Sequence, residues 1–216
     1  MNISPQDIMS VLRNYNPWWS GKCVSDLPPW RRAAYNEINL WLHNPPAHRA
    51  LLVSGARQVG KTTLLLQACE ALVSEGISPP NVLYATFDHP LLKLAGIEQV
   101  LKLWRESELA DQGTEYLFLD EIQFIRDWQV WLKHQVDFNK KRRITVTGSA
   151  VPLVTAGQES GVGRWHTIKL ATLSFHEFLR IKMLSVPDIP EVNSFAQLFS
   201  WSPGQFNRVA ELARPL

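Results

Sequence analysis

Short apolar runs alternate with helical patterns through the middle of the chain, and this alternation limits the fold more than any other feature. The runs of strand length are RALLVSG at 49–55, NVLYATFD at 81–88, EYLFLD at 115–120, RRITVTGS at 142–149 and RWHTIKL at 164–170. Apolar residues at helical spacing separate the first four of them, at 61–74, 97–109 and 127–138. Strands that alternate with helices favour βαβ units. We therefore expect an α/β fold built on a mainly parallel sheet.

The two ends of the chain differ from this middle part. Residues 1–29 show no regular pattern and end in DLPPW, where paired prolines favour an extended chain; helical spacing then runs over 30–44. Three further helical patterns are SFHEFLRIKM at 174–183, SFAQLFS at 194–200 and GQFNRVAELA at 204–213. We expect an N-terminal irregular segment and helix at 1–48, a core at 49–172 and a helical part at 173–216.

The composition is typical of a folded protein from a reducing compartment. Of the 216 residues, 45% are hydrophobic and 19% are charged, which is enough apolar material for a core. A formal net charge of +2 does not by itself indicate a nucleic-acid or membrane partner. Cys23 and Cys69 form neither a disulfide framework nor a metal-ligand pattern. Without a signal-peptide pattern or an apolar run of membrane-spanning length, we expect a cytoplasmic protein with no membrane partner.

The stretch GARQVGKTT at 55–63 follows the first expected strand and opens a helix. It fits the P-loop pattern G-x-x-x-x-G-K-[ST], in which backbone N–H groups and the positive end of the helix face phosphate oxygens. The alternative is a chance match, but the strand before and the helix after are the context that the motif demands. Lys61 would reach the β- and γ-phosphates, and the Thr62 hydroxyl would bind Mg²⁺. The expected nucleotide-binding residues are Gly55, Ala56, Arg57, Gln58, Val59, Gly60, Lys61, Thr62 and Thr63.

The run YLFLDEIQ at 116–123 places two carboxylates at the end of an expected strand. Asp120 lies where open parallel sheets bind ligands, and it suits the outer coordination sphere of Mg²⁺. Glu121 could polarise a water molecule for attack on the γ-phosphate. The alternative is an acidic pair that caps the next helix. That alternative leaves two carboxylates beside a phosphate site without a metal to balance them, so we favour catalysis.

Three polar features admit two interpretations each. Thr147 and Ser149 end the fourth expected strand, where a hydroxyl could orient the attacking water or satisfy backbone groups, and the sequence does not choose between the two residues. The run KKRR at 140–143 could contact DNA, but cations also suit a helix C-terminus, and no aromatic residues interleave the run. Asp88 and His89 could face the γ-phosphate or form a turn.

Together these motifs resemble the AAA+-type ATPases of bacteria and archaea that begin with NPWW and carry the loop G-P-R-Q-V-G-K-T-T. In this chain NPWW is at 16–19, and Ala56 stands where the loop usually has proline. DEIQFIRDW at 120–128, TGS at 147–149, a glycine–arginine pair at 163–164 and LSFHEF at 173–178 match the other motifs of the group in order. The resemblance covers about residues 15–180.

The resemblance implies a P-loop three-layer sandwich with a parallel five-stranded sheet in the order 5-1-4-3-2, followed by a helical lid. It also implies ATP, since no guanine-reading N-K-x-D occurs. Members usually continue into a C-terminal domain, so we expect this chain to be the ATPase half with an incomplete lid. We expect that lid to exchange its amide hydrogens faster than the core.

The resemblance further assigns a role to Arg164, which would reach the γ-phosphate of a neighbouring subunit and so require a homo-oligomer. The alternative for Arg164 is a surface ion pair, and Arg57 is a weaker candidate for the same role. We expect Mg²⁺-dependent ATP binding and hydrolysis that drives a conformational change in an attached or partner domain. The rivals are a slowly hydrolysing ATP-bound signalling switch and a small-molecule kinase. The expected catalytic residues are Glu121, Lys61, Arg164, Thr147 and Ser149, and the expected metal ligands are Thr62 and Asp120.

Overall fold

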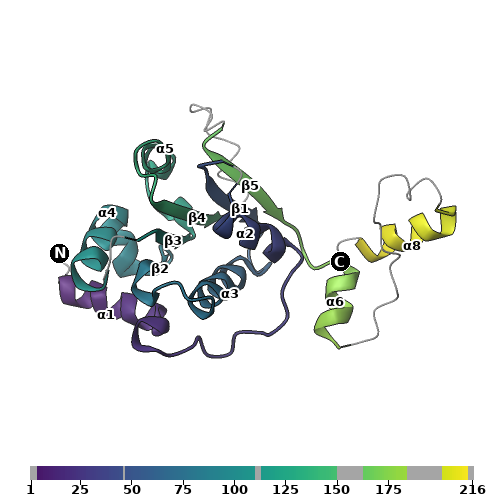
Figure 1. The fold of residues 1–216 in the computed structure, drawn as a ribbon, viewed down its shortest axis with the longest axis horizontal. Helices are drawn as coiled ribbons and strands as arrows, with labels where there is room; N and C mark the ends of the chain where they lie inside the picture. Colours follow the sequence, from purple (N-terminus) through teal and green to yellow (C-terminus); the bar gives the residue numbers. More distant parts are fainter. Residues whose placement is uncertain (1–3, 46, 110–112, 150–162, 184–200, 214–216) are drawn as a thin grey trace. The chain divides into compact units, whose positions relative to one another are not determined.

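The computed structural model describes residues 4–45, 47–109, 113–149, 163–183 and 201–213 (Figure 1). The chain divides into two compact units, Met1–Leu170 and Ala171–Leu216. The expected helix at 194–200 lies outside the described residues. Among the described helices, none is long and apolar enough to cross a membrane.

The first unit is built on five strands that all pair in parallel. Their order across the sheet is β2-β3-β4-β1-β5, which confirms the expected order 5-1-4-3-2. The central strands carry unbroken apolar runs because both of their faces are covered. The strands are β1 (Ala50–Gly55), β2 (Val82–Thr86), β3 (Glu115–Asp120), β4 (Arg142–Gly148) and β5 (Trp165–Leu170).

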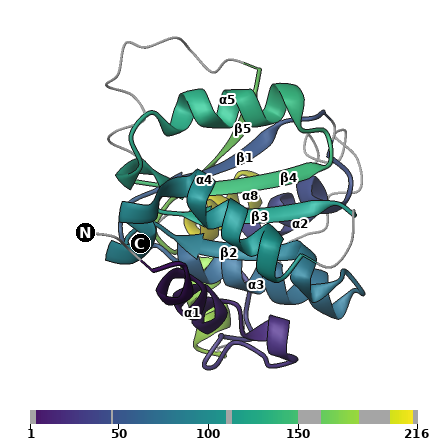
Figure 2. The same ribbon diagram turned by 90° about the vertical axis from the view of Figure 1, so that its left-hand side faces the viewer.

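Helices cover both faces of this sheet and give the expected three layers (Figures 1 and 2). On one face α1, α4 and α5 pack on a buried cluster that includes Leu52, Leu117 and Val146. On the other face α2 and α3 pack on a cluster that includes Val53 and Phe118. The helices of this unit are α1 (Pro5–Tyr15), α2 (Ala34–His43), α3 (Lys61–Ser74), α4 (Pro90–Ser107) and α5 (Trp128–Phe138). Three short 3₁₀ turns are η1 (Pro17–Ser20), η2 (Pro79–Asn81) and η3 (Ile122–Phe124).

The expectation that residues 1–29 are irregular is wrong for α1. The Ser4 side chain caps this helix by accepting from the backbone N–H of Gln6, and Pro5 occupies the first turn, where its missing N–H costs nothing. Ile8, Met9 and Leu12 form its buried face. The helix expected over 30–44 is shorter than predicted, because α2 begins only at Ala34.

The NPWW segment hydrogen-bonds the outer edge of β2, the strand at one side of the sheet. The Asn16 carboxamide donates to the carbonyl of Tyr84 at 2.8 Å and accepts from the Tyr84 N–H at 2.7 Å. The indole N–H groups of Trp18 and Trp19 both donate to the Val82 carbonyl, at 3.0 and 2.9 Å. The segment therefore satisfies backbone groups that an edge strand otherwise exposes.

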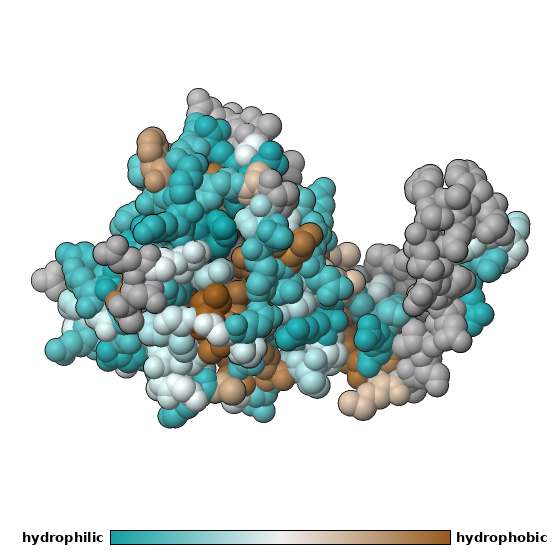
Figure 3. Space-filling view, in the orientation of Figure 1, coloured by the Kyte–Doolittle hydropathy of each residue, from teal (hydrophilic) through white to brown (hydrophobic). Residues whose placement is uncertain are grey.

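The surface of the first unit is mostly hydrophilic on the face drawn in Figure 3. Its exposed large apolar side chains are spread over α2, α4 and α5: Leu40, Leu94, Val130 and Phe138. In the second unit, α6 (Phe175–Ile181) begins with a capping box between Ser174 and Glu177, and it contacts α8 (Pro203–Ala213). The expected weaker protection of 174–216 stays a prediction.

Candidate nucleotide-binding site

The loop between β1 and α3 needs glycine at both ends, for two different reasons. A Cβ on Gly55 would lie 2.3 Å from the backbone oxygen of Leu170, so the close approach of β5 excludes any side chain there. Gly60, which precedes α3, has φ +94°, a left-handed conformation that glycine adopts without steric cost. The loop turns sharply between these two points, and Ala56, Arg57 and Gln58 are exposed on it.

The start of α3 is suited to bind an anion. No side chain caps this end of the helix, so its first backbone N–H groups and its positive dipole face the loop. Lys61, in the first turn, is 4% exposed, and its Nζ donates to the carbonyls of Gly55 at 3.2 Å and Ala56 at 2.8 Å. The loop therefore holds a buried cation at the place where a phosphate chain would lie.

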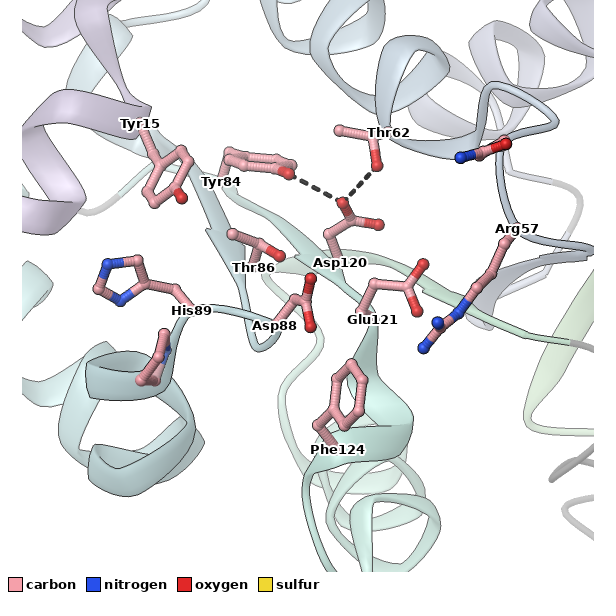
Figure 4. A pocket seen from close by; sticks show the side chains of 12 residues that line it. Tyr15, Arg57, Thr62, Tyr84, Thr86, Asp88, His89, Asp120, Glu121 and Phe124 are labelled. Atoms are coloured by element: carbon pink, nitrogen blue, oxygen red, sulfur yellow. Dashed lines mark hydrogen bonds between the residues drawn. The ribbon is translucent and has the colours of Figure 1, made fainter.

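Asp120 ends β3, is 2% exposed, and accepts hydrogen bonds from three hydroxyl groups. Its Oδ2 accepts from Thr62 Oγ1 at 2.7 Å and from Tyr84 Oη at 2.9 Å (Figure 4). Its Oδ1 accepts from Thr147 Oγ1. Burial, followed by the charge of Asp120, raises the pKa of the Tyr84 hydroxyl well above its usual range, so Tyr84 acts as a donor at physiological pH.

Glu121 has a left-handed backbone conformation, with φ +52°. Its N–H donates to Thr147 Oγ1 at 2.9 Å, and its Oε1 lies 3.6 Å from Lys61 Nζ. Gln123 Nε2 donates to its other carboxylate oxygen, Oε2. Glu121 directly precedes η3 but makes no side-chain cap to it, which argues against the interpretation of this acid as a helix cap. Glu121 shares this conformation with Gln58 of the phosphate loop, among the five described non-glycine residues with positive φ.

The two candidate hydroxyls after β4 differ in their placement. Thr147 is fully buried and links Asp120 to the backbone of Glu121. Ser149 follows the end of β4 and is half-buried. The structure thus brings Thr147 into the acidic site, while the assignment of either hydroxyl to the attacking water stays a prediction.

Arg164 lies at the opposite end of the sheet from the phosphate loop. It immediately precedes β5, next to the start of β1, whereas the loop follows the end of β1. Its Nε donates to both carboxylate oxygens of Asp137, at 3.1 and 3.2 Å. This is the surface ion pair of the alternative interpretation. The action of Arg164 on a neighbouring molecule stays a prediction.

Sequence reasoning missed three residues that contact the site: Tyr84, Gln123 and Arg32. Arg32 is 6% exposed, and its Nη1 donates to the Val59 carbonyl inside the phosphate loop at 2.8 Å. The pair RR at 31–32 carried no motif, and Tyr84 was interpreted only as a strand residue. Gln123 belongs to the DEIQ run at 120–123, but its position there does not by itself indicate a role.

A cavity of about 610 Å³ opens beside the loop and extends to the end of β2 (Figure 4). Asp88 and His89, for which two interpretations were open, both line it. The His89 ring also accepts from the Leu91 N–H at 3.3 Å at the start of α4, so the turn interpretation holds as well. The lining residues are Tyr15, Arg57, Gln58, Thr62, Tyr84, Thr86, Asp88, His89, Pro90, Asp120, Glu121 and Phe124.

The donor set fits magnesium that arrives with phosphates. Within the described ranges, no three His, Cys, Asp or Glu residues gather into a metal site. Thr62 and Asp120 instead offer two oxygen atoms that could bind a metal, and these atoms lie within hydrogen-bond distance of each other beside the loop. Mg²⁺ prefers oxygen ligands and is usually held by one or two protein groups together with substrate phosphates.

The sheet order and the glycine loop between β1 and α3 define the P-loop class of α/β proteins. The model of one family, AAA_14, described as an AAA domain, matches residues 47–179, which is more than half of the chain. The chain therefore belongs to this family of AAA-type ATPases. Membership of the narrower group with NPWW and LSFHEF motifs stays a prediction.

Two known proteins show similarity of different kinds. An "uncharacterized protein" of Haemophilus influenzae is 35% identical over 136 residues, which is 61% of this chain and 33% of that protein. The chain thus spans about a third of the length of this relative. The crystal structure of Cdc6p from Pyrobaculum aerophilum matches with a TM-score of 0.52 at 15% identity, over 74% of this chain and 50% of that one. At this identity the likeness shows the fold alone.

Proposed function

We propose that the protein binds and hydrolyses ATP with Mg²⁺ and that this cycle changes the conformation of an attached or partner domain. One observation carries the proposal: Lys61, Thr62, Asp120 and Glu121 form one connected group at the carboxyl ends of β1 and β3. Lys61 supplies a buried cation, Thr62 a hydroxyl, and Asp120 and Glu121 two carboxylates, all beside the loop between β1 and α3. This combination supplies phosphate binding, metal binding and a group that can orient water, which are parts that phosphoryl transfer to water uses.

Each residue has a distinct task in this proposal. The loop N–H groups and Lys61 bind the phosphate oxygens, and Thr62 with Asp120 would hold the metal. Magnesium supplies positive charge that offsets the phosphate charge when it is bound. Glu121 orients and deprotonates the attacking water, and Thr147 fixes the relative position of the two acids through one hydroxyl.

The signalling switch is the second candidate, and a specific contact favours it. Both carboxylate oxygens of Glu121 have protein partners, Lys61 on one and Gln123 on the other. In this arrangement Lys61 and Gln123 compete with an attacking water for the oxygens of this carboxylate. A protein that keeps this arrangement with nucleotide bound would hydrolyse ATP slowly.

The partners follow from weaker observations. The longer relative supports an attached domain, and Arg164 would make the site depend on a homo-oligomer. The basic run at 140–143 is already engaged within the chain: Lys140 Nζ donates to the Val136 carbonyl of α5, and Arg142 pairs with Glu115. The Lys140 contact lies at the end of α5 and supports the helix-end interpretation for that residue, whereas Arg142 belongs to β4 and is held by a residue of β3.

Phosphate release measured with Glu121→Gln tests the proposal. We expect multiple turnovers by the unchanged protein, near-normal nucleotide affinity in the variant, and turnover lower by about 10²–10⁴-fold, the usual contribution of a general base. Glu106→Gln, on the exposed side of α4, is the matched control. Wild-type turnover by Glu121→Gln would remove the catalytic assignment. Retained ADP without turnover by the unchanged protein would favour the switch.

A further inference from the structure

Tyr84 reaches Asp120 because of the register between β2 and β3. Thr86 lies directly opposite Asp120 in this pairing, and Tyr84 is two residues earlier on the same face of the sheet. A diagonal neighbour at this spacing is within reach of a long aromatic side chain. The phenol extends along the sheet, and its hydroxyl donates to Oδ2 of Asp120 at 2.9 Å.

That carboxylate oxygen is the one that also accepts from Thr62. Tyr84 therefore acts on the side of Asp120 that faces the proposed metal position, whereas Thr147 binds the other oxygen. A carboxylate held on both oxygens by buried donors cannot rotate about its last torsion without breaking a hydrogen bond. The tyrosine is 2% exposed, so water does not readily replace its hydroxyl.

The backbone of Tyr84 is fixed from the other side. The Asn16 side chain, which is 1% exposed, bonds both the N–H and the carbonyl of Tyr84. The ring of Tyr15 contacts the Tyr84 ring with centroids 6.0 Å apart. The place from which the phenol reaches Asp120 is thus set by the NPWW segment and the end of α1.

We propose that Tyr84 is a positioning residue that holds Asp120 in the orientation needed to bind magnesium with the nucleotide. This inference rests on the proposed function, because it concerns the metal at that same site. Tyr84 contacts neither phosphate nor metal in this role and acts through the carboxylate. Loss of such an outer partner usually weakens metal affinity or activity about 10–100-fold.

Tyr84→Phe tests the role, because it removes the hydroxyl and keeps the ring. Affinity for a fluorescent ADP analogue is measured in EDTA and over a Mg²⁺ titration. We expect affinity in EDTA equal to that of the unchanged protein and a half-saturating Mg²⁺ concentration raised about tenfold. Tyr116→Phe is the matched control, since Tyr116 lies on the same strand as Asp120 but at its opposite end. Thermal unfolding of each variant establishes that it is folded.

A double-mutant cycle with Asp120→Asn separates positioning from a general packing effect. If Tyr84 acts through Asp120, adding Tyr84→Phe to Asp120→Asn leaves the Mg²⁺ dependence where the single Asp120→Asn change puts it. An unchanged Mg²⁺ midpoint in folded Tyr84→Phe would overturn the positioning role alone. Failure of the unchanged protein to bind the analogue would instead overturn the proposed function, and equal losses of affinity with and without Mg²⁺ would show a merely structural role.

Discussion

The ammonium of Lys61 lies 3.6 Å from the carboxylate of Glu121, and both side chains are largely buried. The same ammonium donates to two carbonyls of the phosphate loop. The residue expected to bind phosphate and the residue expected to activate water therefore balance each other's charge. Binding of phosphates would draw Lys61 toward them and release one oxygen of Glu121.

Lys61→Ala should abolish nucleotide binding or weaken it at least about tenfold, because a charged hydrogen bond to phosphate is worth about 1.5–3 kcal/mol. Titration with a fluorescent ATP analogue measures this. Lys102→Ala, on the exposed surface of α4, should bind as the unchanged protein does. Equal affinity in the two variants would contradict the assignment of the loop.

Asn16→Ala should lower the free energy of unfolding by about 2–4 kcal/mol. The change removes two hydrogen bonds to Tyr84 and one to the Leu12 carbonyl, each worth about 1 kcal/mol, and leaves buried backbone groups unpaired. Urea unfolding measures the difference. Asn14→Ala, at an exposed position in the last turn of α1, is the control. If Asn16→Ala lowers the free energy of unfolding no more than Asn14→Ala does, the NPWW segment does not stabilise β2.

Stability should fall at acid pH partly through Glu115. Burial alone would raise the pKa of this carboxyl, but the hydrogen bonds and charges of Arg105 and Arg142 outweigh it and hold the pKa below the ordinary value of 4.5. Because the pKa of Glu115 is lower in the folded state than in the unfolded state, its charged form adds to the free energy of unfolding above pH 4.5. This contribution is lost as the pH falls through the folded-state pKa.

Urea unfolding of Glu115→Gln against the unchanged protein between pH 7 and pH 3 tests this. The two stabilities should converge as the pH drops below 4.5, since the protonated carboxyl loses its charge advantage over the amide. A difference that stays constant over this range would mean that the three-residue cluster does not depend on the charge of Glu115.

Arg164 is tested by mixing two inactive variants. If Arg164 acts on a neighbouring subunit, Arg164→Ala and Lys61→Ala should be inactive alone and recover part of the turnover together, because some interfaces then join an intact loop to an intact arginine. Turnover per subunit should also rise with protein concentration. Asp137→Asn, which frees Arg164 from its ion pair without removing it, should keep activity. No recovery on mixing, with turnover independent of concentration, would leave Arg164 a surface residue.

Much of the fold could be predicted because its signals are local. The apolar runs gave all five strands, and α3 and α5 begin and end within about a residue of the predicted limits. The pattern of α4 was visible only from 97 onward, because Gly96 interrupts the helix with φ +76°. Helix α1 was missed because its apolar face is short. Ile8, Met9 and Leu12 are recognisable as a buried face only once they pack on the core.

The candidate site likewise contains residues that local motifs predicted and residues that only the folded chain brings into place. Lys61, Thr62 and Asp120 were predicted because their motifs are contiguous in sequence. Tyr84 and Arg32 were not, because each contact depends on strand register or on a segment that folds back across the loop. The ion pair of Arg164 with Asp137 likewise joins residues that no motif connects.

The capped edge of β2 also limits how copies of this chain could associate. An open edge strand can pair with the edge strand of another molecule and begin uncontrolled sheet growth. Asn16, Trp18 and Trp19 occupy the hydrogen-bonding groups of β2 that such pairing would need. Growth of the sheet through its β2 side is therefore blocked by three side chains of the same chain, Asn16, Trp18 and Trp19.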